Sequence, residues 1–356
     1  MTDRLFSDFS QRTGDSDSDG MPFDNGHIDM SGGVAALAPV SAAPQAGQTG
    51  APRESWRSAI RYGGEDAASR RREHLIYAGI KQGGAVAALV YILLQPTGWV
   101  AWSGFVFFYV LNILGESLGY HRYFTHKAFE TSRPMRYALG ILAQCGVYGS
   151  LKRWCADHRR HHAHSDRAGD IHSPYVDDYG HAISGRKGLK HAHLAWAYGD
   201  AMTNLDIYGK GIVGDPVIEW CHKTRWIWFG VSAVVAPALW GFAFGGLQAV
   251  VGTVMVAGFL RLALALHAIA AVNSFGHRYG YQNFKGGDQA RNNVLLGVLT
   301  LGEGWHNNHH AHPRGYSTQV RWHEIDVSGW IILGMEKLGL VWDVQRPQMQ
   351  AKPHNR

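Results

Sequence analysis

Long apolar stretches alternate with polar segments along this chain of 356 residues. Residues 76–94 are mostly apolar, and residues 99–118 are apolar except for Asn112 and Glu116. Residues 226–260 contain no charged side chain, which is too long for one membrane span of about 20 residues and suits two. The pattern predicts four membrane-spanning helices in two hairpins, at about residues 76–94, 99–118, 226–243 and 247–271.

The basic residues lie on one side of these predicted spans. The turns at residues 95–98 and 241–246 carry no Lys or Arg, whereas residues 119–225 carry fifteen and the chain after residue 272 carries nine. By the positive-inside rule, both termini and the long middle segment face the cytoplasm. The net charge of +6 then needs no nucleic-acid partner. A soluble protein with two buried helical hairpins is disfavoured, because uncharged runs of this length are rare in soluble cores.

The segments outside the spans complete the predicted organisation, an all-α membrane protein with a helical cap on the cytosolic side. The polar N-terminal segment has little to bury, so we expect it to be disordered. Residues 137–148 are apolar but too short to span, so we expect them in the membrane interface or partway into the membrane. The predicted boundaries are 1–72 for the N-terminal tail, 73–345 for the membrane domain, 119–225 and 273–345 for its cap segments, and 346–356 for the C-terminal tail.

Histidine is strongly over-represented, with 21 residues, roughly three times its ordinary share. Most of the clustered histidines fall in the predicted cap or at the cytosolic ends of the spans. Four groups stand out: His121 with His126, His158 with His161 and His162, Asn273 with His277, and His306 with His309 and His310.

The spacing within each group predicts how the side chains point. Both H-x-x-H-H groups place three imidazoles on one helical face, and Asn273 and His277 also share a face. His121 and His126 are five positions apart, about 140° around a regular α-helix. That pair fits a single metal poorly, and it suits either two neighbouring metals or a helix that ends between the two residues.

Nine clustered imidazoles exceed the capacity of one metal ion. Two metals with four or five ligands each would use them, and imidazole suits zinc, copper, iron and nickel alike. A zinc site would be satisfied by three or four ligands. An all-imidazole centre with two metals beside a membrane therefore favours iron and oxygen chemistry.

Four motifs carry a resemblance to a known family: GYHRYFTH at residues 119–126, WCADHRRHHAHSD with GDIHSPY at 154–175, NSFGHRYGYQNF at 273–284, and GEGWHNNHHAHP at 302–313. The chain resembles the integral-membrane fatty acid desaturases, in particular the delta-9 acyl-CoA (stearoyl-CoA) desaturase-like group. The resemblance implies four spans and a cytosolic cap that holds two iron ions. It implies as ligands His121, His126, His158, His161, His162, His277, His306, His309 and His310, with Asn273 acting through a water.

The resemblance also implies the reaction. Such an enzyme inserts a cis double bond, at delta-9, into a saturated C16–C18 acyl chain, using O2 and two external electrons. The electrons come from a separate donor of the ferredoxin, rubredoxin or cytochrome b5 type with its reductase, since no haem-binding H-P-G-G signature occurs here. The acyl carrier stays open between coenzyme A, acyl carrier protein and a lipid, because Ala156 stands where animal acyl-CoA members have a basic residue.

Two other functions remain as alternatives. A related membrane di-iron hydroxylase, ketolase or alkane oxygenase would share the histidine motifs. A membrane metal transporter is less favoured, because transporters place their ligands near the middle of the bilayer.

Further residues are candidates for the substrate path and for orienting the imidazoles. By resemblance Trp154, one turn before His158, lines the acyl tunnel, and Phe105, Phe108 or Tyr109 closes its far end. Arg186, Lys187 and Lys190 are candidates for binding phosphates of the carrier. Carboxylates commonly orient metal-binding imidazoles. Candidates for that role are Asp157, Asp170, Glu303 and Asp326, and His267 is a further candidate for supporting the ligands.

Overall fold

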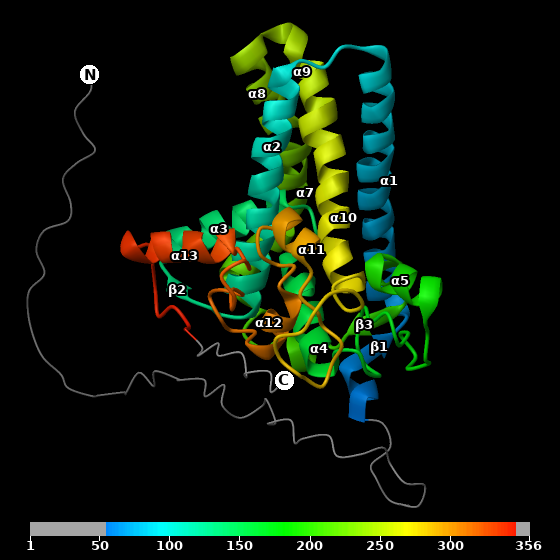
Figure 1. Ribbon diagram of the computed structural model, residues 1–356. Coiled ribbons are helices and arrows are strands. Elements are labelled where there is room, and N and C mark those ends of the chain that lie inside the picture. The colour runs from blue at the N-terminus through cyan, green and yellow to red at the C-terminus, as the bar shows by residue number, and fades with distance from the viewer. Residues whose placement is uncertain (1–54, 347–356) are drawn as a thin grey trace, which may run out of the picture. The chain divides into compact units, whose positions relative to one another are not determined.

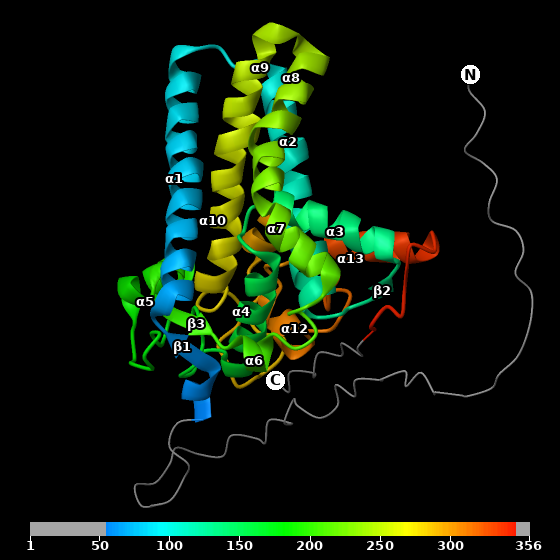
Figure 2. The same ribbon diagram turned by 180° about the vertical axis from the view of Figure 1, so that it is seen from behind.

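A computed structural model describes residues 55–346 of the chain. Within this range four helices are long and apolar enough to cross a membrane: Gly64–Leu94, Trp99–Thr125, Pro216–Gly245 and Leu247–Ser274. They run side by side, with both hairpin turns at one end and the remaining elements gathered at the other (Figures 1 and 2). The predicted fold class, an all-α membrane protein with four spans, is confirmed.

Three of the four spans contain a stretch of π-helix. The first is the single helix α1 (Gly64–Leu94), and the second joins α2 (Trp99–Leu114) to the π-helix η2 (Gly115–Thr125). The third runs through α7 (Pro216–Gly230), η4 (Val231–Val235) and α8 (Ala236–Gly245). The fourth runs through α9 (Leu247–Thr253), η5 (Val254–Leu260) and α10 (Arg261–Ser274).

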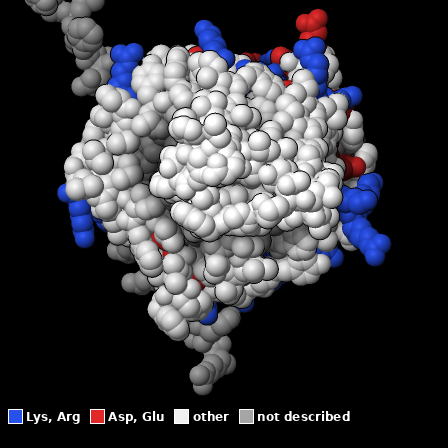
Figure 3. Space-filling model, turned by 90° about the horizontal axis from the view of Figure 1, so that it is seen from above, with Lys and Arg blue, Asp and Glu red and all other residues white. Residues whose placement is uncertain are grey.

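Each span reaches further from the hairpin turns than the apolar pattern predicted. The first begins at Gly64 instead of residue 76, because its early turns carry charges such as Arg70 that the apolar pattern excluded. The second hairpin turns at Gly246, whose positive φ of 71° suits glycine. Seen from the hairpin turns, the middle of the surface is uncharged and Lys and Arg side chains lie only towards the rim (Figure 3).

The cap consists of the described residues outside the four spans. The helix α3 (Arg133–Cys145) is too short to span, as predicted, and it lies across the bundle axis (Figures 1 and 2). The other cap elements are η1 (Ser55–Ala59), β1 (Ile60–Tyr62), β2 (Glu130–Thr131), α4 (Leu151–His164), α5 (Gly185–His193), η3 (Ala195–Tyr198), β3 (Ala201–Thr203), α6 (Leu205–Tyr208), α11 (Val294–Leu299), α12 (His306–Ala311), α13 (Val327–Lys337) and β4 (Val341–Trp342).

The structure corrects the predicted extent of the N-terminal tail. Residues 55–72 are ordered, since β1 pairs antiparallel with β3 and α1 begins at Gly64. Ile60 and Ala59 are buried there against Ala201, which supplies the apolar contact that the polar composition concealed. The rest of the predicted N-terminal tail and nearly all of the C-terminal tail lie outside the described residues.

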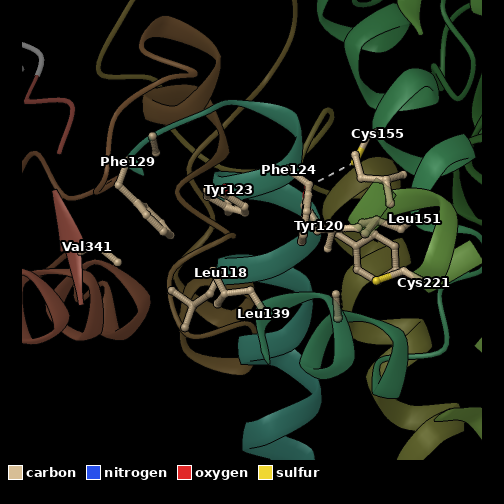
Figure 4. Close-up of a cluster of buried hydrophobic side chains, with 14 of the residues drawn as sticks. Leu118, Tyr120, Tyr123, Phe124, Phe129, Leu139, Leu151, Cys155, Cys221 and Val341 are labelled. Atoms are coloured by element: carbon tan, nitrogen blue, oxygen red, sulfur yellow. Dashed lines mark hydrogen bonds between the residues drawn. The ribbon is translucent and has the colours of Figure 1, made fainter. Parts of the chain in front are cut away.

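The largest buried apolar cluster lies where the second span enters the cap. Tyr120, Tyr123 and Phe124 from η2 pack against Leu139 of α3 and Leu151 of α4, all of them buried (Figure 4). Thus the histidine-bearing end of the second span is clamped on several sides before any metal is considered.

Close helix packing requires glycine at two points. A Cβ added at Gly115 would lie 2.3 Å from the Leu142 carbonyl oxygen of α3. A Cβ at Gly258, on η5, would lie 2.1 Å from the Ala233 carbonyl oxygen of η4. Small residues at such contacts let membrane helices approach closely.

We expect Gly258→Ala to destabilise the fold by about 1–3 kcal/mol, because the added methyl group forces two packed spans apart. Thermal unfolding of the purified protein in detergent measures the effect. Gly79→Ala is the matched control, since nothing lies within 4 Å of a Cβ at that position on α1. Equal unfolding midpoints for the two variants would contradict this account of the packing.

Candidate metal centre

Five histidines from three elements form one group. His121 belongs to η2 and His126 follows its end, His158 and His162 lie on α4, and His309 lies on α12. One ring nitrogen from each of the five lies within 4.8 Å of all the others. The five rings therefore converge on a single point that one metal ion would fill.

Four further histidines form a second group beside the first. His161 comes from α4, His277 follows α10, and His306 and His310 lie on α12. Their ligand atoms also lie within 4.8 Å of one another. The structure thus divides the nine predicted ligands into groups of five and four, a division that the spacing had left open.

The local helix type explains how His121 and His126 join the same group. A regular α-helix would point them about 140° apart. The chain here is π-helical, and His126 N–H donates to the His121 carbonyl oxygen at 3.1 Å, the i to i+5 bond of that helix. The wider turn brings the two rings within 4.9 Å, centre to centre. The π-helix therefore creates the fifth ligand position.

Four of the rings are held through Nδ1 by buried or largely buried carboxylates. Glu303 pairs with His121 at 2.5 Å, and Asp170 pairs with His161 at 2.8 Å. The other two pairs are Asp166 with His277 at 2.8 Å and Asp288 with His310 at 2.7 Å. A carboxylate on Nδ1 fixes the tautomer and leaves Nε2 without a proton, which is the form that binds a metal.

The facing nitrogens fit a bound cation. Nε2 of His309 lies 2.8 Å from Nε2 of His162 and 2.9 Å from Nε2 of His121. In the second group, Nε2 of His306 lies 3.0 Å from Nε2 of His277. Carboxylates hold Nδ1 of both His161 and His310, so their Nε2 atoms, 3.3 Å apart, bring two lone pairs together. A metal ion among them relieves that repulsion.

Burial keeps most of these rings neutral in the absence of metal. Burial and the neighbouring imidazoles lower the pKa of His158, His162 and His309 well below the ordinary value. Burial would also lower the pKa of His277, but the Asp166 carboxylate outweighs it and raises that pKa. Burial, with Asp166 nearby, raises the pKa of Asp170 to about 7. Neutral imidazoles are the state that metal binding requires.

Three of the residues predicted to support the metal ligands have other hydrogen-bond partners in the structure. Asp157 accepts a hydrogen bond from Thr203 at 2.5 Å and contacts no ligand ring. Asp326 binds Arg122 and caps α13, because it accepts from the Gly329 amide. His267, on α10, hydrogen-bonds His193 and Gln82. Asp170 and Glu303 lie where a supporting role requires them.

Asp166 and Asp288 were missed by the sequence reasoning. Asp166 lies four residues after His162, within a quoted motif, so its proximity to a histidine group was the available signal. Asp288 lies in a Gly-rich loop 22 residues before His310, and no spacing rule links the two. The ring of His172, within the motif at residues 154–175, lies 4.2 Å from that of His161, centre to centre.

An inner cavity adjoins both histidine groups. Trp154 lies on its wall and stacks on His158 with ring centres 4.8 Å apart. Asn273 lines the same cavity beside His306. Glu116, buried with an exposed fraction of 4%, also faces it. Arg261, a charged residue on α10, instead ties the third and fourth spans together by donating to the Ser232 carbonyl oxygen.

The remaining substrate candidates lie further away. Phe105 and Tyr109 line an apolar groove between α2, α10 and α11, where the Tyr109 hydroxyl donates to the Leu299 carbonyl oxygen at 3.0 Å. Arg186 and Lys187 are exposed on the first turn of α5. The structure therefore does not bring the two basic residues into the inner cavity.

Comparison with known proteins identifies the family. The chain belongs to the fatty acid desaturase family, whose model matches residues 97–327. The predicted resemblance is thereby confirmed, and the chain is an integral membrane protein of that oxidoreductase family. The family is known for a di-iron centre, and the two histidine groups fit metal binding.

Several curated relatives cover most of the chain. It is 35% identical over 277 residues to the hex-5-enoyl-(acyl-carrier protein) acetylenase of Moorena producens, covering 78% of this chain and 86% of that protein. It is 32% identical over 272 residues to the sn-2 palmitoyl-lipid 9-desaturase of Nostoc sp., covering 74% and 88%. It is 31% identical over 244 residues to a probable acyl-CoA desaturase of Schizosaccharomyces pombe, covering 67% and 48%.

We expect the metal-free protein to lose stability steeply as the pH falls from 7.5 to 5.5. Seven of the predicted ligand rings have lowered pKa values, so below about pH 6.5 the unfolded chain binds protons that the folded chain does not. Each such ring lowers the free energy of unfolding by up to about 1.4 kcal/mol for each pH unit below that value. Thermal unfolding after chelator treatment measures this, and a midpoint that does not change with pH would contradict it. The seven rings are His126, His158, His161, His162, His306, His309 and His310.

Proposed function

We propose that the protein is an O2-dependent fatty acyl desaturase that inserts a cis double bond, at delta-9, into a saturated C16–C18 chain. The observation that carries the proposal is the convergence of nine imidazoles into neighbouring groups of five and four. Five nitrogen ligands exceed what a zinc site uses, and imidazole suits iron. The ligands would be the nine histidines, with Asn273 beside the four-histidine group through a water.

Two bound iron ions would supply the oxidising power to remove hydrogen from an unactivated carbon chain, using O2 and two electrons. The protein's own residues hold the imidazole rings and orient the acyl chain. The carboxylates Asp166, Asp170 and Asp288, with Glu303, fix four of the rings through Nδ1. Trp154 presents an apolar wall beside His158, where the chain would lie close to the metals and away from water.

The cap faces the cytoplasm in this proposal, with both termini on that side. The support is the distribution of charge, since the hairpin turns at residues 95–98 and 241–246 carry no Lys or Arg. The histidine groups then lie at the cytosolic ends of the spans, where a soluble electron donor can reach them. That donor would be a ferredoxin, rubredoxin or cytochrome b5 with its reductase.

Acyl-CoA, acyl carrier protein and membrane lipid are the three carriers to be compared. The three relatives named above include one of each kind, which supports an acyl substrate without selecting its carrier. Arg186 and Lys187 stay proposed contacts for a carrier phosphate, from an exposed position on α5. Supplying the purified enzyme with the same acyl chain on each carrier separates the three.

We expect membranes that contain the protein to form monounsaturated chains only when O2 and an electron donor are supplied. His161→Ala removes a ligand of the four-histidine group and should lower product at least a hundredfold, whereas His181→Ala, whose side chain is 76% exposed, should not. Gas chromatography–mass spectrometry with double-bond location measures the product. Equal product from wild type and His161→Ala would contradict the desaturase activity. A hydroxylated product would instead indicate an oxygenase, and a product with a triple bond would indicate an acetylenase.

Tyr109 is expected to limit the length of the acyl chain. Removing its ring opens the groove between α2 and α11, so Tyr109→Ala should shift the product profile towards chains longer than C18. Val106→Ala on the same helix, 61% exposed, is the control and should leave the profile unchanged. Competition between saturated chains of graded length gives the ratio, and an unaltered preference in Tyr109→Ala would remove this residue from the substrate path.

A further inference from the structure

The short helix α12 serves both histidine groups. It has only six residues, yet His309 joins the five-histidine group while His306 and His310 join the four-histidine group. A helix of this length is not stable on its own in water. Its orientation must therefore be imposed by contacts outside the helix.

The two residues between these histidines provide such contacts. Asn307 accepts from the backbone amides of Asn283 and Phe284, both at 2.8 Å. Asn308, which is fully buried, donates to the Thr318 carbonyl oxygen at 2.8 Å and to Glu324 at 2.9 Å. The two asparagines thus fasten the side of α12 that the ligand rings do not occupy.

Glu324 is the centre of this network. Its side chain is fully buried, with an exposed fraction of 0%. One oxygen accepts from Tyr281 at 2.6 Å and from Asn283 at 2.7 Å, and Asn292 lies 3.5 Å away. The other oxygen accepts from Asn308 at 2.9 Å and from the backbone amides of Val320 and Arg321 at 2.9 and 2.7 Å.

All six of these donors are neutral groups. Among residues 55–346 no Lys, Arg or His forms an ion pair with the Glu324 carboxylate. A buried carboxylate without a cation is costly unless its hydrogen bonds are complete, and here both oxygens are used. The demand for donors links three segments, because the loop at residues 281–292, α12 and residues 318–324 must all be in place at once.

We propose that Glu324 is a positioning residue that acts through Asn308 to hold α12 at the angle from which its three imidazoles reach both metal positions. The inference rests on the proposed occupancy of those positions by iron. Asn307 and Asn308, the two residues inside the second H-x-x-H-H motif, then fasten the helix while its histidines bind the metals.

Glu324→Gln tests the inference. Both carboxylate oxygens accept hydrogen bonds, so the amide NH2 group that replaces one of them must face donors instead of acceptors. The four-histidine group takes two of its four rings from α12 and the five-histidine group takes one of its five, so the two should respond unequally. We expect iron affinity at the four-histidine position to fall about tenfold or more, with a smaller loss at the other. Titration of ferrous iron against a competing chelator measures both affinities without turnover.

Matched variants separate positioning from general damage. Glu336→Gln makes the same chemical change on α13, where the carboxylate pairs with Arg346, and should bind two irons as the wild type does. Glu324→Asp keeps the charge and should partly restore affinity. Asn308→Ala should reproduce the unequal loss, and it decides the matter if Glu324→Gln does not fold.

The outcomes distinguish this inference from the proposed function. A wild-type protein that binds no iron would overturn the di-iron proposal itself. If the wild type binds two irons, then wild-type affinities in Glu324→Gln and Asn308→Ala would overturn the positioning role. An equal loss at both positions that follows the fall in unfolding temperature would also overturn it, because a purely structural role predicts that result.

Discussion

The fold depends on bringing nine imidazole nitrogens together in a buried space. Unprotonated Nε2 atoms about 3 Å apart repel one another through their lone pairs, and burial excludes the water that would otherwise separate them. Carboxylates on Nδ1 fix this tautomer on four of the nine rings, and burial keeps most of the rings neutral. The arrangement is therefore a strained receptor for two cations, and much of the cap exists to hold it.

Arg122 shows how the cap meets that demand. Its guanidinium, one residue from His121 and 2% exposed, binds Glu303 at 2.9 Å and Asp326 at 2.9 Å. Glu303 in turn holds His121, and Asp326 caps α13, so one buried cation joins the second span to the end of the cap. Losing one partner of such a buried pair is strongly destabilising, by about 3–5 kcal/mol. The ring of His121 is thus held by a chain of contacts that runs from Glu303 through Arg122 to Asp326.

The spans and the clustering of the histidines could be predicted because both rest on short-range patterns. Uncharged runs reveal membrane helices, and H-x-x-H-H places three rings on one face. The division into five and four could not be predicted, since it depends on η2 being π-helical and so turning His126 back towards His121. Asp288 and Glu324 were missed because they act across loops, where no spacing rule applies. Asp157 was expected near a ring but faces Thr203, since its side of α4 turns towards β3.

The proposed function requires that the chain hold two iron ions in unlike sites of five and four histidines. Mössbauer spectroscopy of the purified protein loaded with isotopically enriched ferrous iron tests it most directly. Two quadrupole doublets of equal area are expected, because the two sites differ in ligand number. Both should be lost from a variant in which His162 and His306 are alanine. A single doublet from one iron per chain, or no bound iron at all, would contradict it.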